Sequence, residues 1–222
     1  MAQGFVGNNP VTPNFVTDSG TATAVSNSVS ILGTGGTSTS ATGSTITVTS
    51  TDVGAWTLID TQTASASATL DFTTGITSAY NTYVFVLDSV RSATSGSTGF
   101  LMQVSTDTGS SYLSSGYISG VSWIAYNSST VNNINVTGDV RLTPGEVDTN
   151  YGICGNIYMY NIATAKEPMM MIDLISRSGS ADTVRVMGTA NNATTSSVDA
   201  FQFSFSSGNI ADGTIRLFGI TG

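Results

Sequence analysis

The acidic residues Glu146 and Asp148, in the segment TPGEVDTN, are the pair whose types and spacing could do chemistry. Two carboxylates that project from one loop can act as general acid and general base in glycoside hydrolysis. Asp107 and Asp139 are the other carboxylates considered for this role. A solvated acidic loop is the simpler interpretation. A calcium site is a third alternative, although it would need roughly six to eight oxygen ligands, more than this cluster supplies by itself.

Histidine is absent from the chain of 222 residues, so Ser-His-Asp and Cys-His arrangements are excluded. The single cysteine, Cys154, cannot form an intrachain disulfide or a thiolate metal cluster within one chain. Its neighbours in YGICGNIYMY are typical of a strand, and we expect Cys154 to be a small buried residue.

Met169, Met170 and Met171 precede IDLIS in another strand-like run, which predicts core packing. Together these observations favour a protein that is not an enzyme, with no cofactor and no metal.

Four aromatic side chains fall between turns rich in Ser and Asn, namely Tyr112, Tyr117, Trp123 and Tyr126. Aromatic faces in shallow grooves are a usual way to bind sugars, so these residues are candidate glycan contacts. Tyr117, Trp123 and Tyr126 also lie in one strand-like run, where packing in the core or at a subunit interface is the default role. Both interpretations stay open for these residues.

The formal net charge is −8, and only 9% of residues are charged, against about 25% in ordinary soluble proteins. The six basic residues all lie beyond position 90 and form no cluster. Direct binding to nucleic acid or to an anionic membrane surface is therefore not expected.

The first residues lack the features of a secretory signal, and no window approaches the roughly 20 apolar residues of a membrane span. We expect synthesis in a cytoplasm.

From about residue 55 onward, runs of apolar and β-branched residues alternate with turns of Gly, Ser, Asn and Asp, which predicts strands. The expected strands are 55–60, 67–72, 82–90, 99–105, 117–126, 131–138, 151–162, 168–178, 182–190, 198–207 and 213–220. In VDAFQFSFSS, the residues Phe201, Phe203 and Phe205 share one sheet face. No helical periodicity is available to cover that face. The predicted fold class is therefore all-β, an antiparallel β-sandwich over residues 55–222.

The chain before the sandwich has a different character. Residues 1–28 contain two prolines and no strand-length periodic run, which predicts an extended N-terminal arm. Residues 29–54 are rich in Gly, Ser and Thr, and two short alternating runs, SVSIL (28–32) and STITVTS (44–50), border a loop too long for a tight hairpin turn. An isolated two-stranded hairpin is marginal in water. We therefore expect this pair to dock on the sandwich or to pair with copies of itself, three copies forming a β neck.

The string SNSVSILGTGGTSTSATGSTITVTS resembles a neck segment of tailed-bacteriophage fibres and other virion appendage proteins. The order of AWTLIDTQTASASATLDF, LMQVSTDTGSSY and FSFSSGNIADGTIRLFGI is similar to the C-terminal domain of many phage tail-fibre-like proteins. The positions that carry this similarity are Trp56, Asp71 with Phe72, Ser105 to Tyr112, and Gly208 to Gly219. The resemblance covers roughly residues 28–222, and none of its motifs is a catalytic signature.

This resemblance implies a virion structural protein, a homotrimer made in the host cytoplasm, with a β-sandwich tip of jelly-roll type. We also expect attachment to other virion proteins through the arm of residues 1–28, and contact of the tip with a host surface glycan. A tail fibre or receptor-binding appendage is the first expectation. Head fibres, capsid decoration proteins and tail adaptors reuse such modules and are the alternatives. A polysaccharide depolymerase that uses Glu146 and Asp148, or a carbohydrate-binding module, is a rival from a different class.

Overall fold

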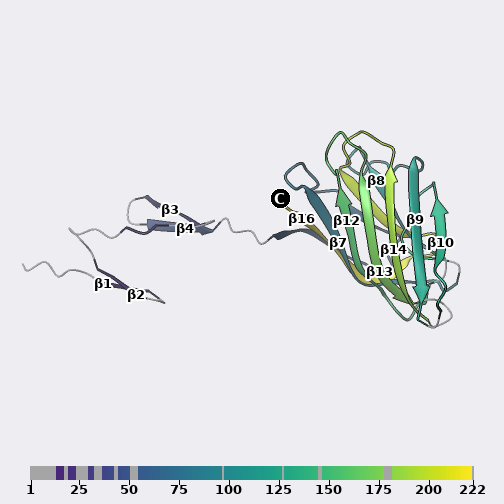
Figure 1. The fold of residues 1–222 in the computed structure, drawn as a ribbon. Coiled ribbons are helices and arrows are strands. Elements are labelled where there is room, and N and C mark those ends of the chain that lie inside the picture. The colour runs from purple at the N-terminus through teal and green to yellow at the C-terminus, as the bar shows by residue number, and fades with distance from the viewer. Residues whose placement is uncertain are drawn as a thin grey trace, which may run out of the picture. The chain divides into compact units, whose positions relative to one another are not determined.

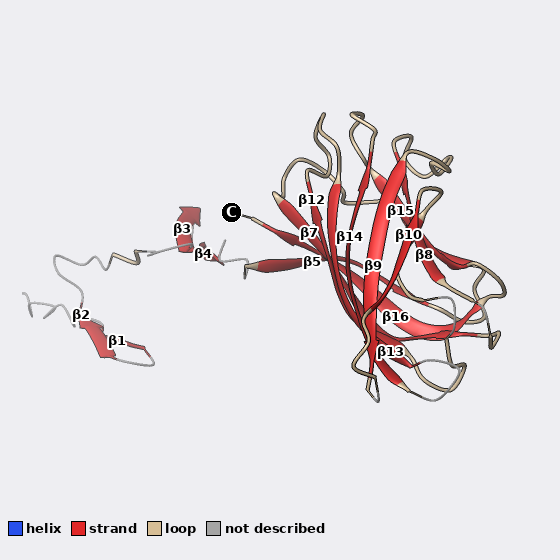
Figure 2. Ribbon diagram, turned by 45° about the vertical axis from the view of Figure 1, so that its right-hand side comes forward, coloured by secondary structure: helices blue, strands red, loops and turns tan. Residues whose placement is uncertain are grey.

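The computed structural model describes residues 14–17, 20–23, 30–32, 37–42, 45–50, 55–96, 98–126, 128–144, 147–177 and 182–221. The chain divides into two units, residues 1–53 and residues 54–222. The described residues form antiparallel strands and loops without a helix (Figure 2). None of them belongs to a helix long and apolar enough to span a membrane. The predicted all-β class with antiparallel sheets is confirmed.

The second unit contains a larger and a smaller sheet (Figure 1). The larger sheet has eight strands in the order β10-β9-β14-β13-β12-β7-β16-β5. These strands are β5 (Trp56–Thr63), β7 (Thr82–Ser92), β9 (Tyr117–Ala125), β10 (Asn132–Val136), β12 (Ile153–Tyr160), β13 (Met169–Arg177), β14 (Thr183–Asn192) and β16 (Ile210–Ile220). The smaller sheet has four strands in the order β11-β8-β15-β6. They are β6 (Thr69–Phe72), β8 (Phe100–Ser105), β11 (Val140–Arg141) and β15 (Ala200–Phe205).

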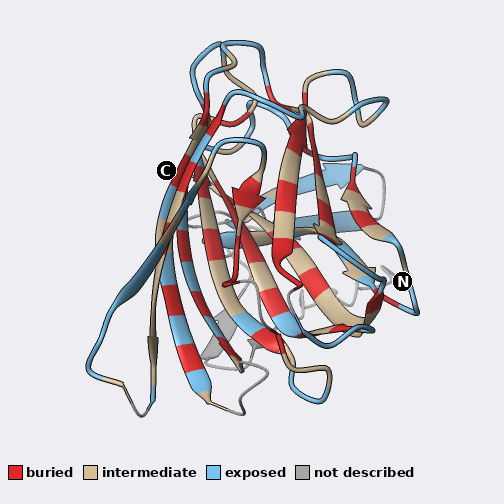
Figure 3. Cartoon of the chain, turned by 90° about the vertical axis from the view of Figure 1, so that its right-hand side faces the viewer, coloured by how far each residue is buried: buried red, intermediate tan, exposed pale blue. Residues whose placement is uncertain are grey.

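The hydrophobic core lies between these two sheets, because each sheet alternates buried and exposed residues along its strands (Figure 3). Phe201 and Phe203 of β15 meet Phe85 of β7, with ring centroids 5.1 and 4.9 Å apart. Phe72 of β6 meets the same ring at 5.0 Å. Phe201, Phe203 and Phe205 are all buried, as the alternation in their segment predicted. Aromatic rings from both sheets thus form the centre of the sandwich.

The eleven strands predicted beyond residue 55 correspond to β5 to β10 and β12 to β16, with ends that agree within three residues. β11 was not predicted. It contains only Val140 and Arg141, which pair with Met102 and Leu101 of β8. A run of two residues has no periodicity from which a strand could be predicted.

The first unit contains two hairpins. β1 (Asn14–Thr17) pairs with β2 (Gly20–Thr23), so the expectation that residues 1–28 lack strands is wrong for these two segments. β1 and β2 each contain only four residues, too few to show a periodic pattern in the sequence. β3 (Thr37–Thr42) pairs with β4 (Thr45–Ser50).

The predicted partner of segment 44–50 was wrong. Residues 30–32 are not in a strand, and residues 28 and 29 lie outside the described residues. The partner is instead TSTSAT, within the stretch that was interpreted as a loop. Thr42 pairs with Thr45, so that only two residues separate the strands. A two-residue connection favours pairing between sequence neighbours. The three threonines of TSTSAT are compatible with a strand, because Thr is enriched in strands.

Candidate interaction surfaces

Of the predicted acidic pair, only Asp148 lies among the residues that the structure describes. Glu146 lies outside the described residues, so the pair with Asp148 stays a prediction. The Asp148 carboxylate accepts a hydrogen bond of 2.7 Å from the backbone N–H of Asn150, which is a turn-forming contact. Asp107 follows β8, and Asp139 lies between β10 and β11. In the described part of the chain, no three acidic or cysteine side chains lie close enough to hold a metal ion.

Two of the four aromatic candidates belong to the interior of the sandwich. Tyr117 is 1% exposed, and its hydroxyl accepts a hydrogen bond of 2.8 Å from the backbone N–H of Val104. Burial raises the pKa of Tyr117 to about 12. Trp123, on the same side of β9, is half-buried against the core. The glycan contact expected of Tyr117 is therefore corrected to core packing, because alternation along β9 turns this side chain inward.

The other two aromatic candidates lie elsewhere. Tyr126 directly follows β9 and is 89% exposed, beside a shallow hollow that Ile124, Thr183 and Arg185 help to line. Tyr112 lies in the loop after β8 and is partly buried, and burial raises the pKa of its hydroxyl. The four aromatic residues thus do not share one surface. A glycan contact through Tyr126 stays a prediction.

Cys154 is exposed, which contradicts the buried role that we expected. In β12, Ile153, Ile157 and Met159 occupy the inward positions, so that alternation turns Cys154 outward. The backbone N–H of Ser89 donates to its sulfur at 3.4 Å.

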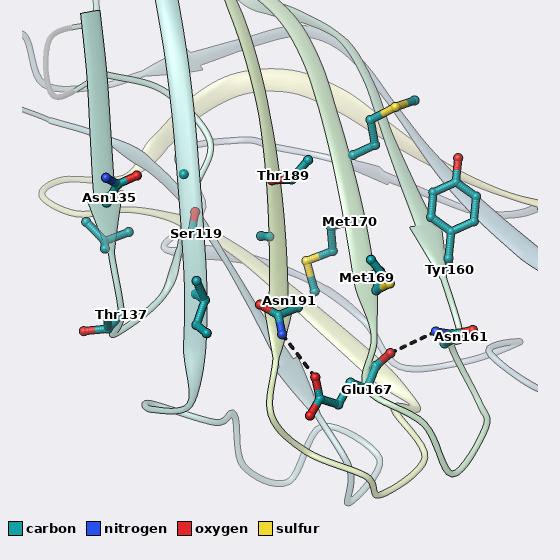
Figure 4. A pocket seen from close by; sticks show the side chains of 15 residues that line it. Ser119, Asn135, Thr137, Tyr160, Asn161, Glu167, Met169, Met170, Thr189 and Asn191 are labelled. Carbon is teal, nitrogen blue, oxygen red and sulfur yellow. Dashed lines mark hydrogen bonds between the residues drawn. The ribbon is translucent and has the colours of Figure 1, made fainter.

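A groove of about 690 Å³ lies on the outer face of the eight-stranded sheet, where Met169 and Met171 are exposed. Figure 4 shows side chains that line it. Gly120 of β9 lies in register with Asn135 of β10 and with Thr189 of β14. Because Gly120 has no side chain, the surface is hollowed between its larger neighbours. Met169 and Met171 of β13 are among the apolar side chains that line it. The strand-like alternation in MMMIDLISR contained this signal, since only Met170 of the three methionines is buried.

One end of the groove is polar and already internally bonded (Figure 4). The amide of Asn191 donates to the carboxylate of Glu167 at 3.2 Å. The amide of Asn161 donates to the backbone carbonyl of Glu167 at 3.1 Å. These bonds fix the loop between β12 and β13 at the mouth of the groove. The groove therefore combines a mostly apolar wall with a rim of neutral amides and one carboxylate.

The β3–β4 hairpin presents a second exposed apolar surface. Ile46 and Val48 are 55% and 61% exposed and lie on the same side of β4. They are paired with Ala41 and Thr39 of β3. The hydroxyl of Thr39 donates to the carbonyl of Ile31 at 2.8 Å, which places the exposed Ile31 beside this face. The described residues of the first unit leave this side uncovered.

No family model matches the chain, and neither the curated proteins nor the solved structures include a match to it.

Proposed function

We propose that this chain is a non-enzymatic structural protein of a bacteriophage virion, a tail fibre or receptor-binding appendage that assembles as a homotrimer. The observation that carries this proposal is the exposed apolar face of the β3–β4 hairpin, formed by Ile46 and Val48. The resemblance of residues 28–222 to phage appendage proteins supplies the biological setting.

An isolated hairpin of two short strands is marginal in water, because it buries little apolar surface. Three hairpins around a threefold axis can turn Ile46 and Val48 toward one another and so bury them. Each Å² of apolar surface removed from water contributes about 25 cal/mol. The opposite face carries Ser38, Ser40 and Thr47, whose hydroxyl groups suit contact with solvent. The hairpin therefore has one face for its copies and one face for water.

In this proposal the three parts of the chain have separate tasks. Residues 1–28 attach the trimer to other virion proteins, the hairpin joins the copies, and the sandwich forms the tip. The tip contacts a host surface glycan, for which the exposed ring of Tyr126 is the best placed of the four aromatic candidates. Immunogold labelling of virions that contain this chain would locate it. A label on the head would favour a head fibre or decoration protein, and a label at the tail junction would favour an adaptor.

The assembly is tested by light scattering on the full chain. We expect a molar mass three times that of the 22.8 kDa chain. A variant with Ile46→Ser and Val48→Ser should shift toward the mass of one chain, because it replaces the apolar side chains of one face with hydroxyl groups. The matched control, Ser40→Thr with Thr47→Ser, changes two residues on the opposite face and should keep the mass. A wild-type chain that is monomeric at all concentrations would contradict the proposal.

A further inference from the structure

The outer face of the eight-stranded sheet concentrates the exposed apolar side chains of the second unit. In its described residues, eleven large hydrophobic side chains are exposed. Six of these lie on outer-face positions of four adjacent strands, β9, β14, β13 and β12: Ile118, Met187, Met169, Met171, Ile175 and Tyr160. Patches of this kind on a soluble protein commonly mark an interaction site.

Strand register places these side chains side by side. One row across the sheet contains Ile118, Asn191, Met169 and Tyr160. The next row contains Gly120, Thr189, Met171 and Tyr158. The same two rows continue through β7 and β16 to Trp56 and Leu58 on β5, which are also exposed. The apolar surface therefore extends across most of the sheet and includes the groove.

The charged side chains on this face are of both signs, although the chain as a whole carries −8. Arg185 of β14 pairs with Asp173 of β13 at 3.1 Å, and Arg216 of β16 pairs with Asp88 of β7 at 3.4 Å. Arg177 of β13 stacks over the ring of Tyr151, with its guanidinium carbon 3.9 Å from the ring centroid. Three of the six basic residues of the chain thus lie on this face. A face that carries both signs repels another copy of this acidic chain less than a surface that carries only negative charge.

We infer that the outer face of the eight-stranded sheet is the surface at which the sandwich domains of neighbouring copies of this chain meet. Around a threefold axis, the outer faces of three copies can turn toward one another, so that each face meets the same apolar side chains and charged groups of both signs on its neighbours. Asp173 of one copy can then approach Arg185 of another. Methionine side chains adapt their shape to such a partner.

This inference rests on the proposed trimer in one respect. Copies that are joined through the hairpin keep their sandwich domains at high effective concentration. A surface of moderate affinity then suffices to bring the domains together. An interface of this kind would also seal the groove, including Met169 and Met171, from solvent.

The test is the rate at which each methionine of the full chain is oxidised by hydrogen peroxide, measured by peptide mass spectrometry. Thioether oxidation requires access of the peroxide to the sulfur. In the assembled wild type we expect Met169, Met171 and Met187 to react several-fold more slowly than in the dissociated Ile46→Ser, Val48→Ser variant. Met102 and Met159 are completely buried and serve as internal references that react slowly in both samples.

Molar mass, measured on the same samples, separates this inference from the proposed function. An assembled wild type in which Met169, Met171 and Met187 react as fast as in the dissociated variant would overturn the inference and leave the hairpin proposal intact. That result would leave the face open to another protein or to a ligand in the groove. A hairpin variant that stays assembled with these methionines protected would support the inference and overturn the role of the hairpin. A monomeric wild type would overturn both.

Substitution of the face gives an independent readout in the full chain. Met171→Glu with Met187→Glu adds two negative charges to the proposed interface. We expect this variant to expose Met169 to peroxide and to weaken the assembly. The control is Val131→Glu, which adds one negative charge at an exposed apolar residue that precedes β10 and lies outside the sheet. Equal protection of Met169 in the two variants would contradict the inference.

Discussion

Ser111 donates two hydrogen bonds to the carboxylate of Asp107, one from its backbone N–H at 2.9 Å and one from its hydroxyl at 2.6 Å. The hydroxyl of Ser105 donates a third at 2.7 Å. The loop between these residues contains Thr108 and Gly109, both with positive φ. Side-chain bonds to Asp107 therefore hold a loop whose backbone leaves the β ladder. This loop belongs to the string LMQVSTDTGSSY, one of the segments that carry the resemblance to phage appendages.

The pKa of Asp107 is expected to be about 2, because the hydroxyl of Ser111 and then that of Ser105 stabilise its ionised form. In the unfolded chain the pKa of an aspartate is about 3.9. Since the pKa is lower in the folded state, Asp107 contributes stability above pH 4 that is lost as the pH falls toward 2. NMR titration of the carboxyl carbon would measure this pKa directly. A pKa near 4 would show that the three hydrogen bonds do not persist in solution.

The matched variants for this loop are Ser111→Ala and Ser110→Ala. Ser111→Ala removes one hydroxyl donor and keeps the backbone N–H of residue 111 and the hydroxyl of Ser105, so the pKa of Asp107 should rise part of the way to its ordinary value. Ser110→Ala removes no side-chain donor to Asp107 and should leave that pKa unchanged. This pKa also bears on the catalytic role for which Asp107 was a candidate. A carboxyl that remains ionised down to pH 2 is a poor general acid near neutral pH.

Gly213 lies at an irregular position of β16, where the register to β7 shifts on both sides of Asp212. Its φ is +111°, and a Cβ atom there would lie 2.5 Å from the carbonyl oxygen of Ser89 and 2.5 Å from Cα of Val90. We expect Gly213→Ala to lower the free energy of unfolding by about 2 kcal/mol or more, because backbone strain and overpacking each cost about 1–3 kcal/mol. Urea unfolding at fixed protein concentration would measure the change.

The control for this prediction is Gly138→Ala. No atom lies within 4 Å of the position that its Cβ would occupy. We therefore expect a change within about 0.5 kcal/mol, as for ordinary surface substitutions. Equal effects of the two substitutions would show that the close approach of β16 to β7 at Gly213 does not constrain the fold.

Long strands with clear alternation could be predicted from the sequence. Phe201 and Phe203 alternate with polar residues, and the structure places both in the core, where they meet Phe85. A single alternating strand contains this information, because successive side chains point to opposite faces. The order of the strands in each sheet depends on partners far apart in the chain, and no local pattern specifies it.

The candidate surfaces could be predicted less well, for a physical reason. Composition favours core packing for Met171 and Cys154, and both are exposed because alternation along their strands turns them outward. The polar run TSTSAT forms β3 because its partner lies only two residues away. In each case the position in a strand pair overrides the preference of the residue type. The phage setting and the role of the tip stay predictions that rest on the resemblance, and the trimer stays a prediction that rests also on the exposed face of the β3–β4 hairpin.

The last prediction concerns Tyr117, which was a candidate glycan contact and is a core residue. Tyr117→Phe leaves the backbone N–H of Val104 without the hydroxyl that now accepts from it at 2.8 Å. A buried donor that loses its acceptor costs about 1–3 kcal/mol, and we expect the free energy of unfolding to fall by that amount at pH 7. Tyr126→Phe is the control, because the exposed Tyr126 should tolerate the change within about 0.5 kcal/mol.

The pH dependence distinguishes the buried hydroxyl from a general loss of packing. The pKa of Tyr117 is raised to about 12 in the folded chain, against about 10 in the unfolded chain. The unfolded state therefore releases this proton first, and the wild type loses stability as the pH rises from 10 toward 12. The Tyr117→Phe variant lacks this contribution, so its deficit relative to the wild type should shrink over the same range. A deficit that stays constant between pH 8 and pH 12 would contradict a buried, hydrogen-bonded hydroxyl at Tyr117.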